Sequence, residues 1–339
     1  GESSRSSRLQ VPDLRVQVAT TSGNPELRGT RDYMRPLLVA LAMFGVLAAS
    51  CSSSGVSDGD DGDLIRFAAV PAEQDTDPTA TYKDIIALLE RSTGKRVQFV
   101  RSTDYNSVIE GLVSGKVDLA QLGPLSYVLA RNNGAKITSI AALVRQGGEP
   151  IYHSYGIVAA HSPIVNIGGF KEAKVCFTDP ASTSGYLFPS QALLSVGIDP
   201  KSGVTPVMAG GQDNAVLSVA TGKCEAGFSE GAMVDHILID KGKLKAGQVK
   251  VVWKSAPIPT SPVAIRDALP NKLRSTLIKT FTQDANKDRL VQLGICKNTD
   301  SCRVATDSSM WGFRPITDAA FDTIREVCVA THHEKCSKA

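Results

Sequence analysis

The sequence predicts an α/β protein of two lobes, each containing a mostly parallel sheet flanked by helices. From residue 64 onward, short apolar runs typical of strands alternate with helical patterns, as they do in successive βαβ units. In addition, NSVIEGLVSGKVDLAQ in the first half of the chain is similar to NAVLSVATGKCEAGFS in the second half. Each segment contains a helical pattern, a Gly-Lys pair and a strand. This duplication, in a chain of 339 residues, favours two similar lobes with a cleft between them over one large sheet.

The first lobe begins with LIRFAAV, a buried-strand pattern that ends before Pro71. A helix is expected next, because four apolar residues fall on one helical face: Tyr82, Ile85, Ile86 and Leu89. RVQFV is the next expected strand. DYNSVIEGLVSG predicts a helix that Asp104 caps and Gly115 ends, and KVDLAQLG returns as a third strand.

The second lobe is expected to repeat this order, with strands KVCFTD, VTPVM and KCEAGF separated by helices GYLFPSQALLSVG and DNAVLSVATG. The stretch SAPIPTSPVAIR contains three prolines and is incompatible with an ordinary helix. Two tail helices, around residues 273–281 and 321–327, bring too few strands for a third lobe, so we expect the tail to pack on the first lobe. The predicted division is residues 64–155 with 258–339 as lobe 1, and 156–257 as lobe 2, joined by a hinge.

The first 63 residues are expected to lie outside both lobes. Residues 1–33 are rich in Arg and Ser without periodicity, which indicates a non-native or over-long N-terminus before Met34. Residues 34–50 predict a signal peptide, because their apolar run is too short to span a bilayer. Small residues precede Cys51 and a polar stretch follows it, so residues 51–63 predict a lipidated cysteine on a flexible tether. The motif is similar to a bacterial lipobox, although its leucine is one residue early. The alternative is an ordinary cleaved signal peptide with a chance cysteine.

The six other cysteines, an even number in a chain expected to be exported, indicate disulfides. Spacing favours Cys296–Cys302 and Cys328–Cys336, which leaves Cys176–Cys224 on two strands expected in one sheet. A metal site that uses His332, His333 and Cys336 is the alternative, but the chain has no second Cys or His pair at ligand spacing. We therefore expect neither a metal nor a cofactor. The formal net charge of +3, without a basic stripe, argues against a nucleic-acid partner.

The segment PASTSGYLFP places three hydroxyl residues at an expected helix start: Ser182, Thr183 and Ser184. One hydroxyl is enough to cap a helix, and a plain cap is the alternative interpretation. Several hydroxyls beside the free N–H groups of a helix N-terminus are what an anion requires. Because the preceding strand delivers this cluster to the expected cleft, we favour an anion site built from neutral donors.

Four segments in order carry a resemblance to a known family: STDYNSVIEGLVSGKVDLAQLGPLSYVLA, YHSYGIVAAHS, FTDPASTSGYLFP and WKSAPIPTSPVAIRDALP. They resemble the PhnD-type phosphonate, phosphite and phosphate substrate-binding proteins of ABC importers, from about Ile65 to Pro270 and weakly to Thr331. The resemblance implies a two-lobed periplasmic-binding-protein fold of type II (Venus-flytrap). It also implies a phosphorus oxyanion as ligand, with a phosphonate first and phosphate or phosphite next, and no enzymatic activity. The expected partners are an ABC permease and ATPase. We expect a monomer anchored by lipid at the outer face of the cytoplasmic membrane.

The resemblance also points, motif by motif, to a set of ligand-binding residues: Tyr105, Ser126, Tyr127 and Tyr152 in the first lobe, and Ser182, Thr183, Ser184, Gln212, Asp213 and Glu230 in the second. Two positions depart from the family pattern. Gln212 stands where relatives have histidine in a GGHD-like turn, and Ser261 stands where aminoethylphosphonate binders have a second acid. Asp213 has the alternative of a helix cap. Glu230 is expected to face the ligand, and the alternative is a solvated residue at the cleft rim.

An enzyme is the competing class of protein. GFSEG at residues 227–231 fits the G-x-S-x-G nucleophile pattern, with Ser229 as nucleophile and His236, His332 or His333 as base. No glycine-rich oxyanion motif precedes it, however, and a short pattern of small residues recurs by chance. We therefore prefer the binding protein and keep the serine hydrolase as the alternative.

Overall fold

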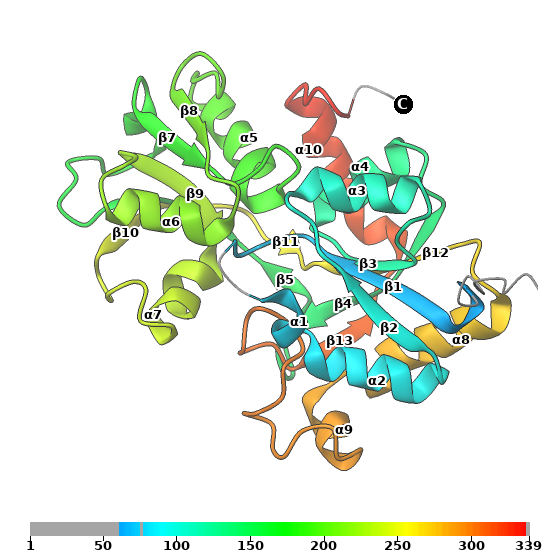
Figure 1. Cartoon of the computed structure of the whole chain (residues 1–339). Coiled ribbons are helices and arrows are strands. Elements are labelled where there is room, and N and C mark those ends of the chain that lie inside the picture. The colour runs from blue at the N-terminus through cyan, green and yellow to red at the C-terminus, as the bar shows by residue number, and fades with distance from the viewer. Residues whose placement is uncertain (1–60, 75–76, 337–339) are drawn as a thin grey trace, which may run out of the picture. The chain divides into compact units, whose positions relative to one another are not determined.

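The computed structural model describes residues 61–74 and 77–336, all within one compact unit, Ser57–Ala339. The predicted signal peptide, Cys51 and most of the tether lie outside the described residues. The two large sheets have six and five strands (Figure 1). None of the helices in the described ranges is long and apolar enough to cross a bilayer.

The first sheet has the strand order β13-β4-β12-β3-β1-β2. The bounds of its strands are β1 Leu64–Ala69, β2 Arg96–Val100, β3 Leu119–Gln121, β4 Ile137–Val144, β12 Pro262–Arg266 and β13 Gly312–Pro315. β1 pairs in parallel with β2 and β3, whereas β12 and β13 come from the last third of the chain and pair antiparallel. The proline-rich stretch therefore supplies β12, an inner strand, with Pro262 as its first residue, where a missing N–H is tolerated.

The second sheet has the order β10-β6-β9-β7-β8. Its strands are β6 Ser154–Ala159, β7 Lys174–Phe177, β8 Thr205–Met208, β9 Ala226–Glu230 and β10 Val249–Lys254. β7 is parallel to β8 and β9, and β6 lies antiparallel between β9 and β10. Both sheets are thus mixed. The predicted parallel pairing holds for the strands joined by helical crossovers, and the segments by which the chain enters and leaves each sheet add antiparallel strands.

A third, two-stranded ribbon forms where the chain passes from one sheet to the other. β5 (Ile151–Tyr152) precedes β6, β11 (Ile258–Pro259) follows β10, and the two pair antiparallel. The two crossings therefore lie side by side, as a hinge requires. The predicted lobe boundaries at residues 155 and 257 fall close to these crossings, and the exact boundaries remain a prediction.

Helices cover both faces of each large sheet. The α-helices are α1 Pro78–Thr81, α2 Lys83–Thr93, α3 Tyr105–Val113, α4 Pro124–Asn132, α5 Phe188–Ser195, α6 Gln212–Ala220, α7 Leu238–Asp240, α8 Asn271–Lys279, α9 Lys287–Gln292 and α10 Asp322–Ala330. In the first sheet, side chains from α3, α4 and α10 form the core on one face, and those from α2 and α8 form the core on the other. Residues of α5 and α6 belong to the two cores of the second sheet. This layering is typical of α/β domains.

The duplicated sequence unit has the same structure in both sheets. α3 and β3 form the first copy, and α6 and β9 form the second. Each helix is followed by a glycine with positive φ, Gly115 at 72° and Gly222 at 75°, a conformation that glycine adopts without strain. Asp104 caps α3 by accepting from the Ser107 N–H at 2.8 Å, as predicted.

The three disulfides have the predicted pairing: Cys176–Cys224, Cys296–Cys302 and Cys328–Cys336. Cys176 lies on β7 and Cys224 directly precedes β9, its parallel neighbour, so the first disulfide links adjacent strands. Because Cys336 is paired with Cys328 in the structure, its sulfur is not available to the alternative metal site while this disulfide is formed.

Candidate ligand-binding site

The candidate site lies where strands of both sheets end. β3 ends at Gln121 and leads into α4, and β7 ends at Phe177 and leads into the hydroxyl-rich turn. Two contacts join these segments. The Leu125 N–H, in the first turn of α4, donates to Thr183 Oγ1 at 2.8 Å, and Ser126 Oγ donates to the Ala181 carbonyl at 2.9 Å. Two helix N-termini, each with N–H groups that have no partner within the helix and with a positive dipole end, therefore meet at one place.

The hydroxyl-rich turn begins a π-helical turn, Thr183–Leu187, that continues into α5. Ser182 is its N-cap, and its Oγ accepts from the Gly185 N–H at 3.0 Å. A Cβ on Gly185 would overlap the side chain of Thr178, so only glycine fits there. Ser182 therefore performs the capping role of the alternative interpretation, while the two hydroxyls that follow it are not needed as caps.

Gln212 connects the turn to the end of β9. Its Nε2 donates to Ser182 Oγ and Ser184 Oγ, both at 3.2 Å, and its Oε1 accepts from the Glu230 N–H at 2.9 Å and from Thr178 Oγ1 at 3.2 Å. Gln212 is buried and both ends of its amide are bonded. The residue that departs from the family pattern thus fixes the orientation of two serine hydroxyls.

Tyr105 and Tyr152 complete what we call the hydroxyl cluster: Tyr105, Tyr152, Ser182, Thr183 and Ser184. Burial raises the pKa of the Tyr105 hydroxyl, and a hydrogen bond with Gln212 opposes this rise only in part. Burial likewise raises the pKa of Tyr152, against hydrogen bonds with Ser184 and Thr183. Both phenols therefore stay protonated and are able to donate hydrogen bonds.

A cavity of about 580 Å³ adjoins the hydroxyl cluster, with Tyr152 and Glu230 in its wall. Burial is the main cause that raises the pKa of Glu230 to about 7, and the negative charges of Asp307 and Glu73 add to it. Glu230 therefore changes its protonation state near neutral pH, whereas a solvated carboxylate at the cleft rim would be ionised there.

Polar contacts join segments of the two sheets, and three of the residues involved, Arg145, His236 and Asp307, line the cavity. Lys241 Nζ lies 2.7 Å from a carboxylate oxygen of the buried Glu73. His236 Nε2 lies 2.8 Å from Asp307, which also pairs with Arg145 at 3.1 Å. Although burial opposes it, hydrogen bonds from Ser309 and His236 hold the pKa of Asp307 below its usual range.

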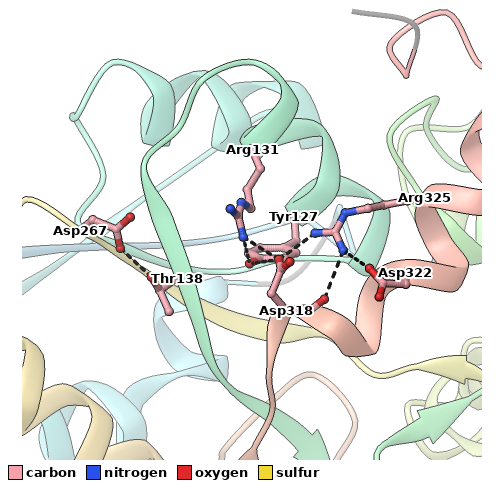
Figure 2. A network of polar contacts seen from close by, with 7 residues as sticks. All are labelled: Tyr127, Arg131, Thr138, Asp267, Asp318, Asp322 and Arg325. Atoms are coloured by element: carbon pink, nitrogen blue, oxygen red, sulfur yellow. Dashed lines mark hydrogen bonds and ion pairs between the residues drawn. The ribbon is translucent and has the colours of Figure 1, made fainter. Parts of the chain in front are cut away.

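Two predicted site residues point elsewhere. The Tyr127 hydroxyl donates to Asp318 at 2.7 Å and also contacts Arg131, in a network between α4 and the C-terminal segment (Figure 2). The Tyr127 ring packs on Phe321. Asp213 is buried, and its carboxylate accepts from the N–H groups of Gln74 and Asn214. The structure brings neither side chain to the hydroxyl cluster.

The serine-hydrolase alternative lacks its geometry. Ser229 is fully buried and its hydroxyl donates to the Gln212 carbonyl at 3.3 Å. Within residues 61–74 and 77–336, no histidine is hydrogen-bonded to Ser229, since His236 bonds Asp307 and His333 bonds the Pro180 carbonyl. Ser229 therefore has no general base.

Sequence reasoning missed three contributors. The α4 N-terminus was overlooked, although a Gly-Pro pair before an apolar helix is a recognisable start signal. Thr178 supports Gln212 and limits position 185 to glycine. Asp307 comes from a loop far along the chain, and no local pattern indicated that it would lie beside the cavity.

Comparison with known proteins shows the family of the chain. Residues 67–321 match the family model of the phosphonate ABC transporter periplasmic substrate-binding protein. The chain is 42% identical to the phosphate-import protein PhnD of Mycolicibacterium smegmatis, over 88% of this chain and 97% of that protein. It is 25% identical to the phosphonates-binding periplasmic protein of Escherichia coli, over 72% and 73% of the two chains.

Two solved structures have the same fold. A binding-protein component of an ABC phosphonate transporter from Pseudomonas aeruginosa superposes with a TM-score of 0.69 at 23% identity, over 79% of this chain and 86% of that one. PhnD1 from Prochlorococcus marinus, in complex with methylphosphonate, gives a TM-score of 0.65 at 17% identity, over 80% and 100%.

The fold and the site thus define a two-lobed substrate-binding protein of the periplasmic type. The chain belongs to the phosphonate-binding family of periplasmic substrate-binding proteins of ABC transporters. It is a transport component and not an enzyme.

Proposed function

We propose that the hydroxyl cluster binds the oxygens of a tetrahedral phosphorus oxyanion for delivery to an ABC permease and its ATPase. The observation that carries this proposal is the meeting of two helix N-termini at Thr183, with buried phenol and serine hydroxyls around it. Hydrogen bonds to a charged group contribute about 1.5–3 kcal/mol each, so several neutral donors are enough to hold a dianion. Preorganised dipoles in a buried site replace the cation that the cluster lacks.

Inorganic phosphate is the first candidate ligand, because the relative at 42% identity is a phosphate-import protein. Hydrogenphosphate carries an O–H group that can donate a hydrogen bond to the ionised carboxylate of Glu230. A small phosphonate is the second candidate, as the family model suggests. A fully deprotonated phosphonate has no such proton, so it requires Glu230 in the protonated form, which its pKa of about 7 permits.

Isothermal titration calorimetry with phosphate, phosphite, methylphosphonate, aminoethylphosphonate and sulfate tests the proposal. We expect binding of phosphate and weaker binding of methylphosphonate. Glu230→Gln should weaken phosphate by about tenfold, since it loses a carboxylate acceptor, and should leave methylphosphonate nearly unchanged. A loss for aminoethylphosphonate alone would instead assign Glu230 to an ammonium group. Absence of binding by all four phosphorus compounds would refute the proposed function.

We further propose that the protein is a monomer and that a lipid on Cys51 holds it at the membrane. The support is the small-residue motif before Cys51 and the polar tether after it. Cys51→Ala should move the protein from the membrane fraction to the soluble fraction in the native host. Retention of the variant in the membrane fraction would contradict the lipid anchor.

A further inference from the structure

The C-terminal loop, residues 328–336, is closed by the Cys328–Cys336 disulfide. The loop is held from within by two backbone bonds, from the His333 N–H to the Cys328 carbonyl at 3.2 Å and from the Cys336 N–H to the His333 carbonyl at 2.8 Å. Both cysteines and His333 are buried, whereas His332 beside them is exposed. The disulfide and these bonds therefore present one imidazole inward at a fixed position.

Both ring nitrogens of His333 are occupied. Nε2 lies 2.7 Å from the Pro180 carbonyl, and Nδ1 lies 3.3 Å from the backbone nitrogen of Lys335. Because the Lys335 N–H is a donor, Nδ1 must accept, so the proton resides on Nε2 and is donated to Pro180. The ring edge also packs against Tyr186, at 5.6 Å between centroids. His333 thus contacts the residues on either side of the hydroxyl-rich turn.

The opposite side of the C-terminal loop is anchored to helices that pack on the first sheet. α10 packs against α4, and also against α5 and the π-helical turn. Figure 2 shows the network that fixes this arrangement, in which Asp318 accepts from Tyr127, Arg131 and Arg325. Lys335 Nζ reaches Asn106 on α3 at 3.0 Å. The C-terminal segment therefore joins α3 and α4 to the turn that carries Thr183.

We propose that His333, held by the Cys328–Cys336 loop, is a positioning residue for the ligand-binding turn. Pro180 lies two residues before Ser182, and the Ala181 carbonyl between them accepts from Ser126 of α4. Fixing the Pro180 carbonyl therefore fixes the register between the two helix N-termini. This inference rests on the proposed function, because the turn is taken to bind the oxyanion.

The neutral form of the imidazole is the one this geometry needs. A proton on Nδ1 would oppose the Lys335 N–H, and burial lowers the pKa of His333 below its usual value. The charged groups that face the ring are Lys335, Glu334 and Lys201, the last two forming an ion pair with each other. Protonation of the ring on acidification should therefore loosen the turn.

The test compares His333→Gln with His333→Met, two side chains of similar length of which only glutamine can donate to the Pro180 carbonyl. Titration with phosphate, or with whichever oxyanion the wild type binds, should give a Kd about five- to tenfold weaker in His333→Met. His333→Gln should bind within about twofold of the wild type. His332→Asn, at an exposed position with φ of 48° that asparagine tolerates, is the matched control and should bind normally.

Two further readouts separate positioning from general stability. The ratio of wild-type to His333→Gln affinity should fall on acidification, because only the wild type gains a proton at this position and Glu230 is common to both. Replacing both cysteines, as Cys328→Ala with Cys336→Ala, should weaken binding as His333→Met does. Equal affinities for His333→Met and His333→Gln, or a ratio that rises on acidification, would overturn the inference. If the wild type binds no oxyanion, it is the proposed function that fails.

Discussion

Replacing Thr183 with valine removes one hydroxyl from the centre of the site while keeping the side-chain shape. Thr183 is buried, and its Oγ1 accepts from the Leu125 N–H at 2.8 Å, which leaves the hydroxyl proton to donate to a ligand oxygen. Loss of a hydrogen bond to a charged group costs about 1.5–3 kcal/mol, which corresponds to a Kd roughly 10 to 150 times weaker. The unpaired Leu125 N–H should also lower the free energy of unfolding by about 1–3 kcal/mol.

Calorimetry with phosphate and urea unfolding of the free protein measure these two effects separately. Thr183→Ser keeps the hydroxyl and should bind within a few-fold of the wild type, because the cluster retains the same donors. An affinity of Thr183→Val within about threefold of Thr183→Ser would refute the role of this hydroxyl. A loss in stability without a loss in affinity would mean that Thr183 only caps α4.

Three other perturbations follow from the structure. Glu230→Gln should reduce the fall in the free energy of unfolding that the wild type shows between about pH 4.5 and pH 7, because the raised pKa makes the native wild type bind more protons than its unfolded chain in this range. At pH 8 the removal of this penalty should raise the free energy of unfolding, measured with urea, by roughly 3 kcal/mol. An unchanged pH profile would contradict this. Gly185→Ala should abolish oxyanion binding, because its Cβ would overlap Thr178, and normal titration would show that the turn adapts. Removing the Cys176–Cys224 disulfide, which closes a loop of 48 residues, should lower the free energy of unfolding by about 4 kcal/mol and lower the melting temperature with it. An unchanged melting temperature would contradict this.

The sequence was sufficient to predict elements that are set by local patterns. β2 has the predicted bounds, Arg96–Val100, and the helical face around Ile85 and Leu89 packs into the core as expected. Glycine and cap residues marked the ends of α3 because their conformational requirements are local. The three disulfides were predictable because short spacing favours two of the pairs, and the expected position of Cys176 and Cys224 on strands of one sheet favours the third.

Long-range pairing was not predictable from the same patterns. The direction in which Tyr127 points depends on Asp318, which lies 191 residues away, and nothing near Tyr127 in the sequence indicates that contact. The sequence allowed Asp213 to be either a helix cap or a ligand-binding residue. In the structure its carboxylate accepts from the backbone N–H of Gln74 instead. Antiparallel β12 was not recognised for a related reason, since Pro262 and the two prolines shortly before it weaken any strand pattern.

We expect the hydroxyl cluster to bind an oxyanion through hydroxyl protons that remain available. In the structure Gln212 donates to Ser182 and Ser184, and the Leu125 N–H donates to Thr183, so each hydroxyl oxygen already accepts a hydrogen bond and can turn its own proton toward a ligand. Each such bond to a charged oxygen contributes about 1.5–3 kcal/mol. Affinity therefore depends on making several of these bonds at once, which requires that the two helix N-termini keep their register. A residue that sets the register, such as His333, should then matter to binding nearly as much as one ligand contact.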